Sequence, residues 1–282
     1  MYGITIENKF GEKLQLTDNV NYKTKVTGLN PVTSDIVTTQ VANYGGARYV
    51  TSKQQTRNIV LTVYINEPVE ANRINLYKYI KSDDWIRLYY KNNTRSVYID
   101  GYVESFEVDL FTQTQTAQVS IICPKPQFLD IENEESIFST TAEAFSFPFW
   151  ANDDNKLVLS TYTSNHAKVV NNESDDDVGF IYKIHCTGAV VNPMIYLEDT
   201  REYLKINRTF KSESIITINT LDGQKSLTFE YKGKTKNIIN DLDMASKWLK
   251  LKAGYNNILQ TAESGIDNML GTLIYTNEYE GV

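Results

Sequence analysis

The 282-residue sequence holds few side chains that could do covalent chemistry. It has two histidines, His166 and His185, and a nucleophilic triad would need one of them beside a Ser or Cys and oriented by an acid. G-x-S-x-G, G-x-x-x-x-G-K-[ST] and H-E-x-x-H motifs are all absent. His185 stands beside Cys186 in an alternating run, which predicts that the two face opposite sides of a strand. We therefore expect no catalytic residues and no enzyme.

The cysteines and the acidic residues do not form a recognisable metal or cofactor site. Cys123 and Cys186 lie far apart in strand-like apolar runs, which is typical of buried thiols in a reducing compartment. The acidic cluster Glu173–Asp177 lacks the spaced ligands and the glycine turn of a known calcium loop, so a solvated hairpin tip is favoured. We expect no metal and no cofactor.

An aromatic run, Phe145–Trp150, is the one place where a sugar ring could stack. Trp150 is therefore the candidate carbohydrate-binding residue, although such a run also fits a core or an interface. Carboxylates are plentiful, and a hydrolase acting on cell walls needs only two of them. Their abundance does not predict such an enzyme, because the required geometry cannot be read from the sequence.

Composition and charge indicate a folded chain with two domains. Hydrophobic residues make up 41% and charged residues 22%, as in globular proteins, and the net charge of −7 argues against a dedicated nucleic-acid binder. Residues 1–130 hold 14 basic and 13 acidic side chains, whereas residues 131–282 hold 14 and 22. The N-terminus has no secretory signal pattern, and no apolar run approaches the roughly 20 residues of a membrane span. We expect synthesis in a cytoplasm and no membrane association.

The first domain, residues 1–130, is predicted to be β-rich with one helix. The helix follows Pro68, with apolar residues at Ala71, Ile74, Tyr77 and Ile80 and with Leu76 widening the stripe. Pro124 and Pro126 close the domain before an acidic connector at 130–135. The expected strands are Tyr2–Ile6, Leu14–Leu16, Asp35–Ala42, Thr56–Ile65, Trp85–Tyr90, Arg95–Phe106 and Thr116–Cys123.

The second domain, residues 136–282, is predicted to be a β-sandwich of short, turn-bounded strands. Asp222-Gly223 and Lys232-Gly233 are hairpin signals, and Leu242–Leu251 is the one helical candidate. The expected strands are Lys156–Tyr162, Ala167–Val170, Phe180–Cys186, Met194–Glu198, Arg201–Ile206, Ser214–Ile218, Ser226–Phe229 and Gly271–Thr276.

Two groups of short motifs occur in a fixed order along nearly the whole chain. The first group comprises Arg57–Leu61, Ala71–Arg73, Leu76-Tyr77, Ile99–Glu104 and Gln118–Phe128. The second comprises Gly188, Asn192–Ile195, Ile218–Thr220, Gly223, Asn240–Asp243, Ser246–Leu249 and Leu251–Asn256. No single motif is diagnostic, but the ordered set resembles the distal tail protein (Dit) family of long-tailed, non-contractile bacteriophages.

This resemblance implies a mainly β protein with a tail-tube-like N-terminal β-barrel or sandwich, one flanking helix, and a galectin-like C-terminal β-sandwich. It implies a homo-hexameric ring in the virion tail tip that joins the tail tube protein to the tail-tip protein (tail-associated lysin or tail fibre). In many such phages the ring also holds receptor-binding proteins, and DNA passes through its channel without specific binding. Some relatives carry inserted carbohydrate-binding modules, for which this chain has no room.

The near-neutral charge of the first domain suits such a channel, because a strongly basic wall would hold the phosphates of passing DNA. The loop Leu29–Asp35 and the stretch Tyr44–Gln55 are candidates for ring contacts, and a mobile surface loop is the alternative for both. The alternative function for the whole chain is a carbohydrate-binding host-adhesion module. A β fold does not decide between these functions.

Overall fold

The computed structural model describes residues 2–17, 19–42, 45–112, 114–143 and 160–282, and the chain divides into two compact units. The first unit is Met1–Ile131 together with Glu278–Val282, and the second is Glu132–Asn277. The last five residues therefore return to the first unit, which differs from the predicted second domain of 136–282. The reason is strand pairing: β24 (Glu278–Tyr279) pairs with β10 (Phe128–Asp130).

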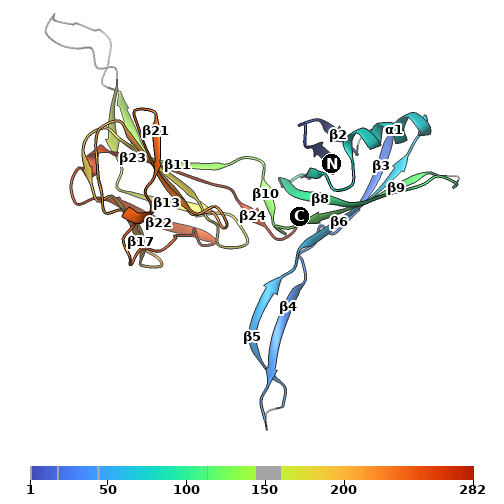
Figure 1. The fold of residues 1–282 in the computed structure, drawn as a ribbon, viewed down its shortest axis with the longest axis horizontal. Helices are drawn as coiled ribbons and strands as arrows, with labels where there is room; N and C mark the ends of the chain where they lie inside the picture. The colour runs from blue at the N-terminus through green and yellow to red at the C-terminus, as the bar shows by residue number, and fades with distance from the viewer. Residues whose placement is uncertain (1, 18, 43–44, 113, 144–159) are drawn as a thin grey trace, which may run out of the picture. The chain divides into compact units, whose positions relative to one another are not determined.

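The first unit is built on one antiparallel sheet in the order β2-β1-β7-β8-β9-β6-β3, with β10 and β24 attached (Figure 1). A separate hairpin of β4 and β5 leaves this sheet just before β6. The remaining strands are β1 (Gly3–Asn8), β2 (Lys13–Gln15), β3 (Tyr22–Thr27), β4 (Ser34–Gln40), β5 (Ala47–Gln54), β6 (Arg57–Ile65), β7 (Trp85–Lys91), β8 (Ser96–Asp109) and β9 (Thr116–Cys123).

Alternation along the strands creates the core of this unit. In β6, Ile59, Leu61 and Val63 are fully buried, while the residues between them face outward. β9 has the same pattern and begins and ends at the predicted residues, Thr116 and Cys123. The inward side chains of the sheet and of α1 form one apolar cluster.

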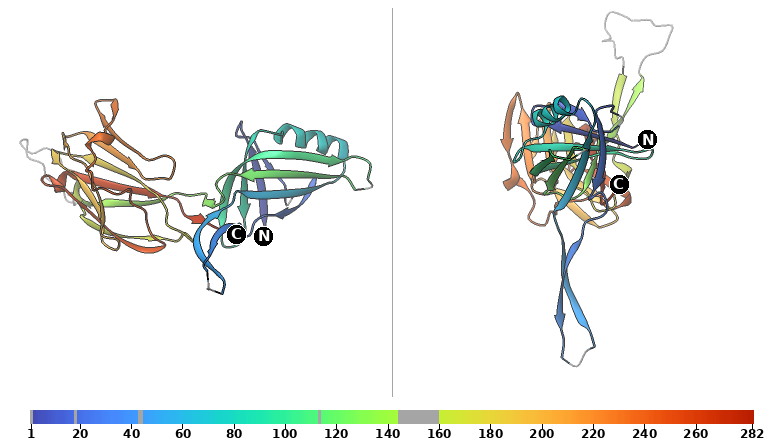
Figure 2. Two further views of the ribbon diagram at one scale, coloured as in Figure 1. Left: turned by 60° about the horizontal axis from the view of Figure 1, so that its bottom comes forward. Right: turned by 90° about the vertical axis from the view of Figure 1, so that its right-hand side faces the viewer.

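Helix α1 (Val69–Tyr79) lies against the sheet, but it buries a different stripe from the predicted one (Figure 2). Asn72, Leu76 and the following Ile80 are buried, at four-residue spacing, whereas Ile74 and Tyr77 are exposed. Hydrogen bonds explain the rotation. The Asn72 side chain donates to the Asn66 carbonyl, and the Tyr22 hydroxyl donates to the Asn72 carbonyl, both at 2.9 Å. Buried polar groups need such partners, so Asn72 turns inward.

The second unit is a β-sandwich of two main sheets. One has the order β12-β11-β23-β14-β19-β20-β21 and the other β13-β22-β16-β17, with a small β15-β18 pair. The inner faces share one apolar cluster. The strands are β11 (Glu134–Glu143), β12 (Ser160–Ser164), β13 (Ala167–Asn172), β14 (Ile181–Cys186), β15 (Val190–Val191), β16 (Met194–Leu197), β17 (Glu202–Lys205), β18 (Thr209–Phe210), β19 (Ser214–Asn219), β20 (Ser226–Tyr231), β21 (Lys234–Asn237), β22 (Gly254–Thr261) and β23 (Met269–Tyr275). The predicted mainly β fold class is confirmed.

Two predictions for this unit were wrong. Leu242–Leu251 is not helical: a short 3₁₀ turn, η1 (Ile239–Asp241), precedes it, and a second, η2 (Ile266–Asn268), comes later. Leu249 and Leu251 are buried in the sandwich core, and Leu251 forms a bridge with Val178. The acidic connector is also shorter than predicted, because β11 already starts at Glu134. Among the described residues, no helix is long and apolar enough to cross a membrane.

Both cysteines are buried and free, and burial raises the pKa of Cys123 and of Cys186 to about 12. The thiolate is the reactive form of cysteine, and an ordinary thiol has a pKa near 8.5. At pH 8 we therefore expect no rapid reaction of the folded chain with a thiol-specific disulfide reagent, and two reacting thiols after unfolding in guanidinium. Reaction of the folded chain at the rate of a free cysteine would contradict this.

Candidate assembly surfaces of the first unit

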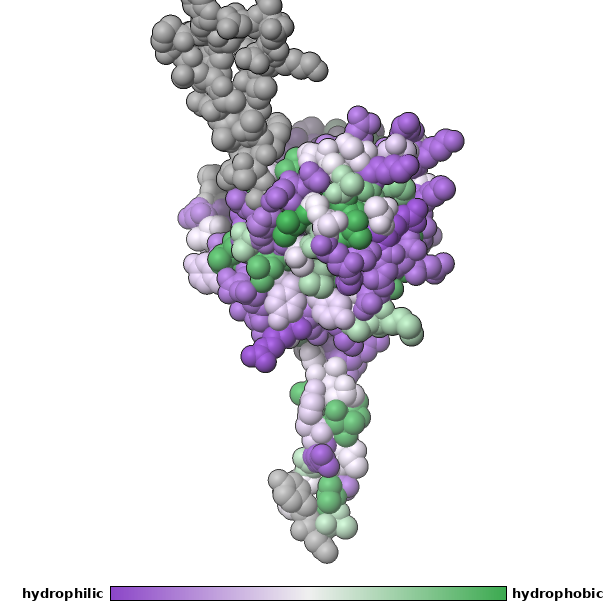
Figure 3. Space-filling model, turned by 90° about the vertical axis from the view of Figure 1, so that its left-hand side faces the viewer, coloured by the Kyte–Doolittle hydropathy of each residue, from purple (hydrophilic) through white to green (hydrophobic). Residues whose placement is uncertain are grey.

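The β4–β5 hairpin projects away from the sheet of the first unit (Figure 1). Every residue of β4 is exposed, and among the described residues the two strands pair only with each other. Exposed apolar residues lie on both strands, including Ile36 (65%) and Tyr49 (59%). Between Asp35 and Lys53 the only charged residue is Arg48, and the hairpin surface is mostly pale or green in Figure 3. Such a hairpin offers open strand edges to a partner.

The predicted contact stretch Tyr44–Gln55 thus turns out to contain a strand, β5. The sequence does not predict this strand, because its two large apolar residues, Tyr49 and Val50, are adjacent and do not alternate with polar ones. The loop Leu29–Asp35 leads into the other strand of the hairpin, β4.

Arg57 holds the base of the hairpin. Its side chain is 1% exposed and donates to four backbone carbonyls, each at 2.6 Å. The acceptors come from three segments: Gly28 and Asn30 before the hairpin, Pro126 after β9, and Glu280 at the C-terminus. The guanidinium also stacks on Phe128, 4.5 Å from the ring centroid. Burial lowers the pKa of Arg57, but a guanidinium stays charged at any physiological pH.

The C-terminal segment is attached around this arginine. Arg95 donates to the Gly281 carbonyl at 2.8 Å, and its guanidinium lies 4.1 Å from the Tyr279 ring centroid. Lys125 pairs with Glu278 at 2.6 Å. The hairpin base and the segment that returns from the second unit therefore share one anchoring point. Sequence reasoning missed Arg57 in this role; a charged residue at the start of an apolar strand was the available signal.

One face of the strands β8, β9, β6 and β3 lies away from the core of the first unit. Apart from the carboxylate of Glu104 on β8, the central side chains of this charge-poor face are uncharged and mostly polar or aromatic: Asn58, Val60, Thr62, Tyr64, Tyr102, Thr116, Gln118, Ser120 and Ile122. The Ser120 hydroxyl lies 3.0 Å from Asn58 Oδ1 and 2.8 Å from Glu104 Oε2, which ties three strands together on this face. A charge-poor, hydrogen-bonded surface of this kind presents little to hold an anion.

Two strand edges bordering this face are open. Within the described residues β3 pairs only with β6. β8 pairs with β7 as far as Tyr102, and Val103 still exchanges hydrogen bonds with the segment before β7. Beyond that point the described strands offer β8 only β9 as a neighbour. The unpaired backbone groups of such edges can form hydrogen bonds with a strand of another chain.

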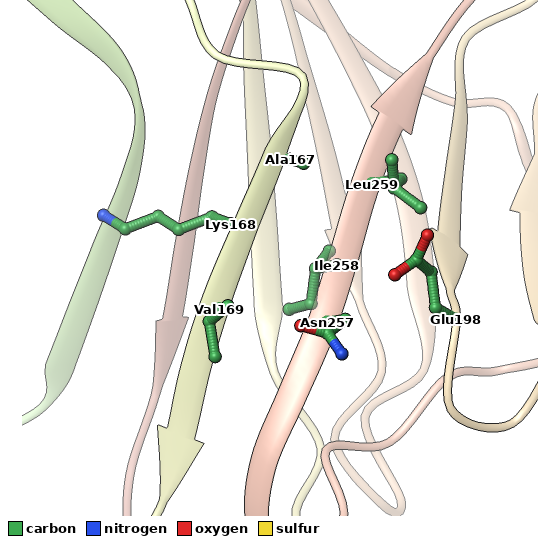
Figure 4. Close-up of a pocket in the computed structure, with 7 residues that line it drawn as sticks. All are labelled: Ala167, Lys168, Val169, Glu198, Asn257, Ile258 and Leu259. Carbon is green, nitrogen blue, oxygen red and sulfur yellow. The ribbon is translucent and has the colours of Figure 1, made fainter.

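The second unit has a shallow pocket of about 150 Å³ on the outer side of β13 and β22 (Figure 4). It is lined by Ala167, Lys168, Val169, Glu198, Asn257, Ile258 and Leu259. Sites for small organic ligands typically measure about 300–1,000 Å³. The pocket is too small to argue for a sugar site.

The structure does not bring the remaining predicted site residues that it describes together into one site. His185 is exposed and Cys186 buried, on opposite faces of β14 as expected. The acidic cluster is a loop after β13 whose three aspartates are exposed, and the described residues hold no group of three or more metal-ligating side chains. His166 precedes β13 and lies 3.3 Å from Asp267. Trp150, the candidate carbohydrate-binding residue, lies outside the described residues.

Comparison with known proteins accounts for both units. Residues 5–123 match the phage tail protein RIFT-related domain, and residues 173–279 match the siphovirus-type tail component, C-terminal domain. The crystal structure of the Dit protein of phage SPP1, described as a paradigm of the hub adsorption apparatus in phages infecting Gram-positive hosts, is similar over 98% of both chains, with 13% identity and a TM-score of 0.68. A chain of the phage P2 baseplate, in its activated conformation with Ca, is similar over 100% of both chains, with 10% identity and a TM-score of 0.50. No curated protein sequence matches.

The two domain matches and the shared fold define a structural component of a phage tail. More particularly, the chain belongs to the siphophage distal tail protein family, and the resemblance seen in the sequence motifs is confirmed.

Proposed function

We propose that the chain forms a ring of six copies around a channel at the tip of the virion tail. The observation that carries this proposal is the charge-poor outward face of β8, β9, β6 and β3, which has no cationic side chain at its centre and an open edge on each side. Identical subunits joined by such unlike edges form a head-to-tail interface, and this closes into a ring when the rotation between copies fits. Closure also removes the exposed edges.

In this ring the charge-poor face becomes the channel wall. Side chains such as Gln118, Thr62 and Tyr64 would then line the path of the DNA. Each phosphate that a cationic wall neutralised would add to a salt-dependent binding energy, and passage would slow. A wall with a neutral centre lets DNA pass without specific binding.

We further infer that the ring is a connector without catalytic activity. It would stand between the tail tube protein and the tail-tip protein, a tail-associated lysin or tail fibre, and receptor-binding proteins would attach at its periphery. The hairpin β4–β5 is the candidate contact between copies, since it is exposed and almost free of charge. The chain would be made in the host cytoplasm and reach the tail tip by assembly. No described residue favours the carbohydrate-binding alternative.

The experiment is native mass spectrometry and negative-stain imaging of the purified chain, alone and with its neighbouring tail proteins. We expect a species of six copies and end-on views with a central hole. A chain that remains monomeric in every condition, or a stable dimer that buries the first unit, would overturn the ring. A glycan array, read at millimolar sugar, distinguishes the adhesion alternative.

A further inference from the structure

The two open edges of the first-unit sheet carry opposite charges on the same face. Lys23 and Lys25 point outward from β3, and Glu107 and Asp109 point outward from β8. All four residues are exposed, and none takes part in an ion pair with a described residue. Their charges are thus available to a partner.

The strand register places these charges at matching levels. Lys25 lies in one cross-strand row with Thr62, Gln118 and Glu107, and Lys23 lies in the next row with Tyr64, Thr116 and Asp109. With about 4.8 Å between neighbouring strands, the two edges of one copy are about 14 Å apart. A lysine therefore cannot reach the carboxylate of its own row, whereas an adjoining copy would bring the two edges to strand-pairing distance.

Apolar residues lie at one end of both edges, just past the row of Lys23 and Asp109. Val20, which is 86% exposed, precedes β3, while Leu110 (41%) and Phe111 (99%) follow β8. Joined copies would bring Val20 of one beside Leu110 and Phe111 of the next. Burial of these side chains would add to the pairing of charges.

The directions of the strands also allow β3 of one copy to pair with β8 of the next. β8, β9, β6 and β3 are each antiparallel to their neighbour, so β3 runs opposite to β8. A rotation about an axis roughly along the strands keeps these directions. β3 of one copy then meets β8 of the next in antiparallel orientation, and the hydrogen-bond ladder of the sheet can continue across the join.

We propose that β3 of each copy pairs with the Ser105–Asp109 part of β8 in the adjoining copy, with Lys23 and Lys25 facing Glu107 and Asp109 across the join. The partner is a second copy of this chain, and the assignment rests on the proposed ring. Beyond the ring itself, the pairing assigns a role to the opposite charges of the two edges. They select head-to-tail pairing of the copies, and they make the stability of the ring depend on the salt concentration.

The test uses two charge-reversed variants of the full chain. Lys23→Glu with Lys25→Glu gives a copy with two acidic edges, and Glu107→Lys with Asp109→Lys gives a copy with two basic edges. All four sites are exposed, so both variants should fold, which thermal unfolding verifies. Lys234→Glu with Lys236→Glu, on the exposed strand β21, is the control with the same change in charge.

Each variant alone should lose the six-copy species at least tenfold in native mass spectrometry, because like charges then face each other. An equal mixture should restore a ring of three copies of each variant, since acidic and basic edges alternate around an even number of copies. The wild-type ring should also dissociate as NaCl rises from about 50 to 500 mM.

Rings formed by both variants alone, or a mixture that does not recover, would overturn the edge pairing while the ring itself stands. A wild-type chain that forms no ring overturns the proposed function and this inference with it. A variant that fails to fold is replaced by the corresponding Gln or Ala pair, which should weaken the ring without abolishing it. A ring of unchanged stability in that pair contradicts the pairing.

Discussion

Replacing Arg57 by methionine is expected to destabilise the first unit by several kcal/mol, since each buried carbonyl left without a donor costs about 1–3 kcal/mol. Methionine fills a similar volume but donates no hydrogen bond. Four backbone carbonyls from three segments then lose their donor at a site closed to water. A small shift of the backbone cannot supply the missing donors, because one guanidinium serves the carbonyls of all three segments.

Hydrogen exchange measured by mass spectrometry is the suitable readout, because it reports on each unit separately. We expect faster exchange in β6, β10 and β24, and unchanged exchange in the sandwich strands β14 and β19. Arg57→Lys should recover only part of the loss, since an ammonium has three donors and no planar fork. Arg48→Met, on the exposed hairpin, is the matched control and should leave exchange in the sheet as in the wild type. Wild-type protection of β6 and β24 in Arg57→Met would contradict the anchoring role.

A strand with regular apolar alternation could be predicted from the sequence, whereas two strands without it were missed. β9 alternates Ala117, Val119 and Ile121 with polar residues, and its bounds were predicted to the residue. In β3 only Tyr22 is buried and the outward residues are lysines and a threonine, and β5 has no buried residue. Their pairing partners, not their own composition, make them strands.

Helix and loop assignments failed where one polar contact overrides an apolar pattern. The predicted stripe of α1 ran through Ile74 and Tyr77, but the hydrogen bonds of Asn72 turn that stripe outward. The segment Leu242–Leu251 was predicted to be helical, yet Leu249 and Leu251 each enter the sandwich core from an irregular segment. Periodicity cannot distinguish these cases, because the deciding partner lies far away in the sequence.

The candidate assembly surfaces were harder to predict than the fold. The charge-poor face and its charged edges exist only once β8, β9, β6 and β3 are in register, and a slip of one residue would move every side chain to the other face. The near-neutral charge of the first 130 residues was consistent with a channel wall of low charge, but it did not indicate which residues form that wall. The four carbonyls bound by Arg57 belong to residues that lie up to 223 positions from it in the sequence, so no local motif predicts them.

Shortening the hairpin should separate assembly from folding. A variant in which residues 36–52 are replaced by Asn-Gly keeps the Asp35–Lys53 pair and all four acceptors of Arg57, and it closes the arms with a two-residue turn. Its thermal stability should stay close to that of the wild type, because no residue of β4 or β5 belongs to the core. Sedimentation velocity should nevertheless show a monomer at concentrations where the wild-type chain forms the ring.

We attribute this loss of assembly to the exposed apolar side chains of the hairpin, and a variant that keeps the hairpin length tests that reason against a matched control. Ile36, Val37 and Val50 changed together to serine remove exposed apolar area but keep the hairpin length, and the ring should weaken at least tenfold. Thr38, Thr39 and Thr51 changed to serine form the matched control and should assemble almost as the wild type does. If the shortened variant still forms six-copy rings, the hairpin is not a contact between copies, and the edges β3 and β8 alone must hold them. If it no longer folds, the hairpin belongs to the framework that Arg57 secures, and its exposed apolar residues need another explanation than assembly.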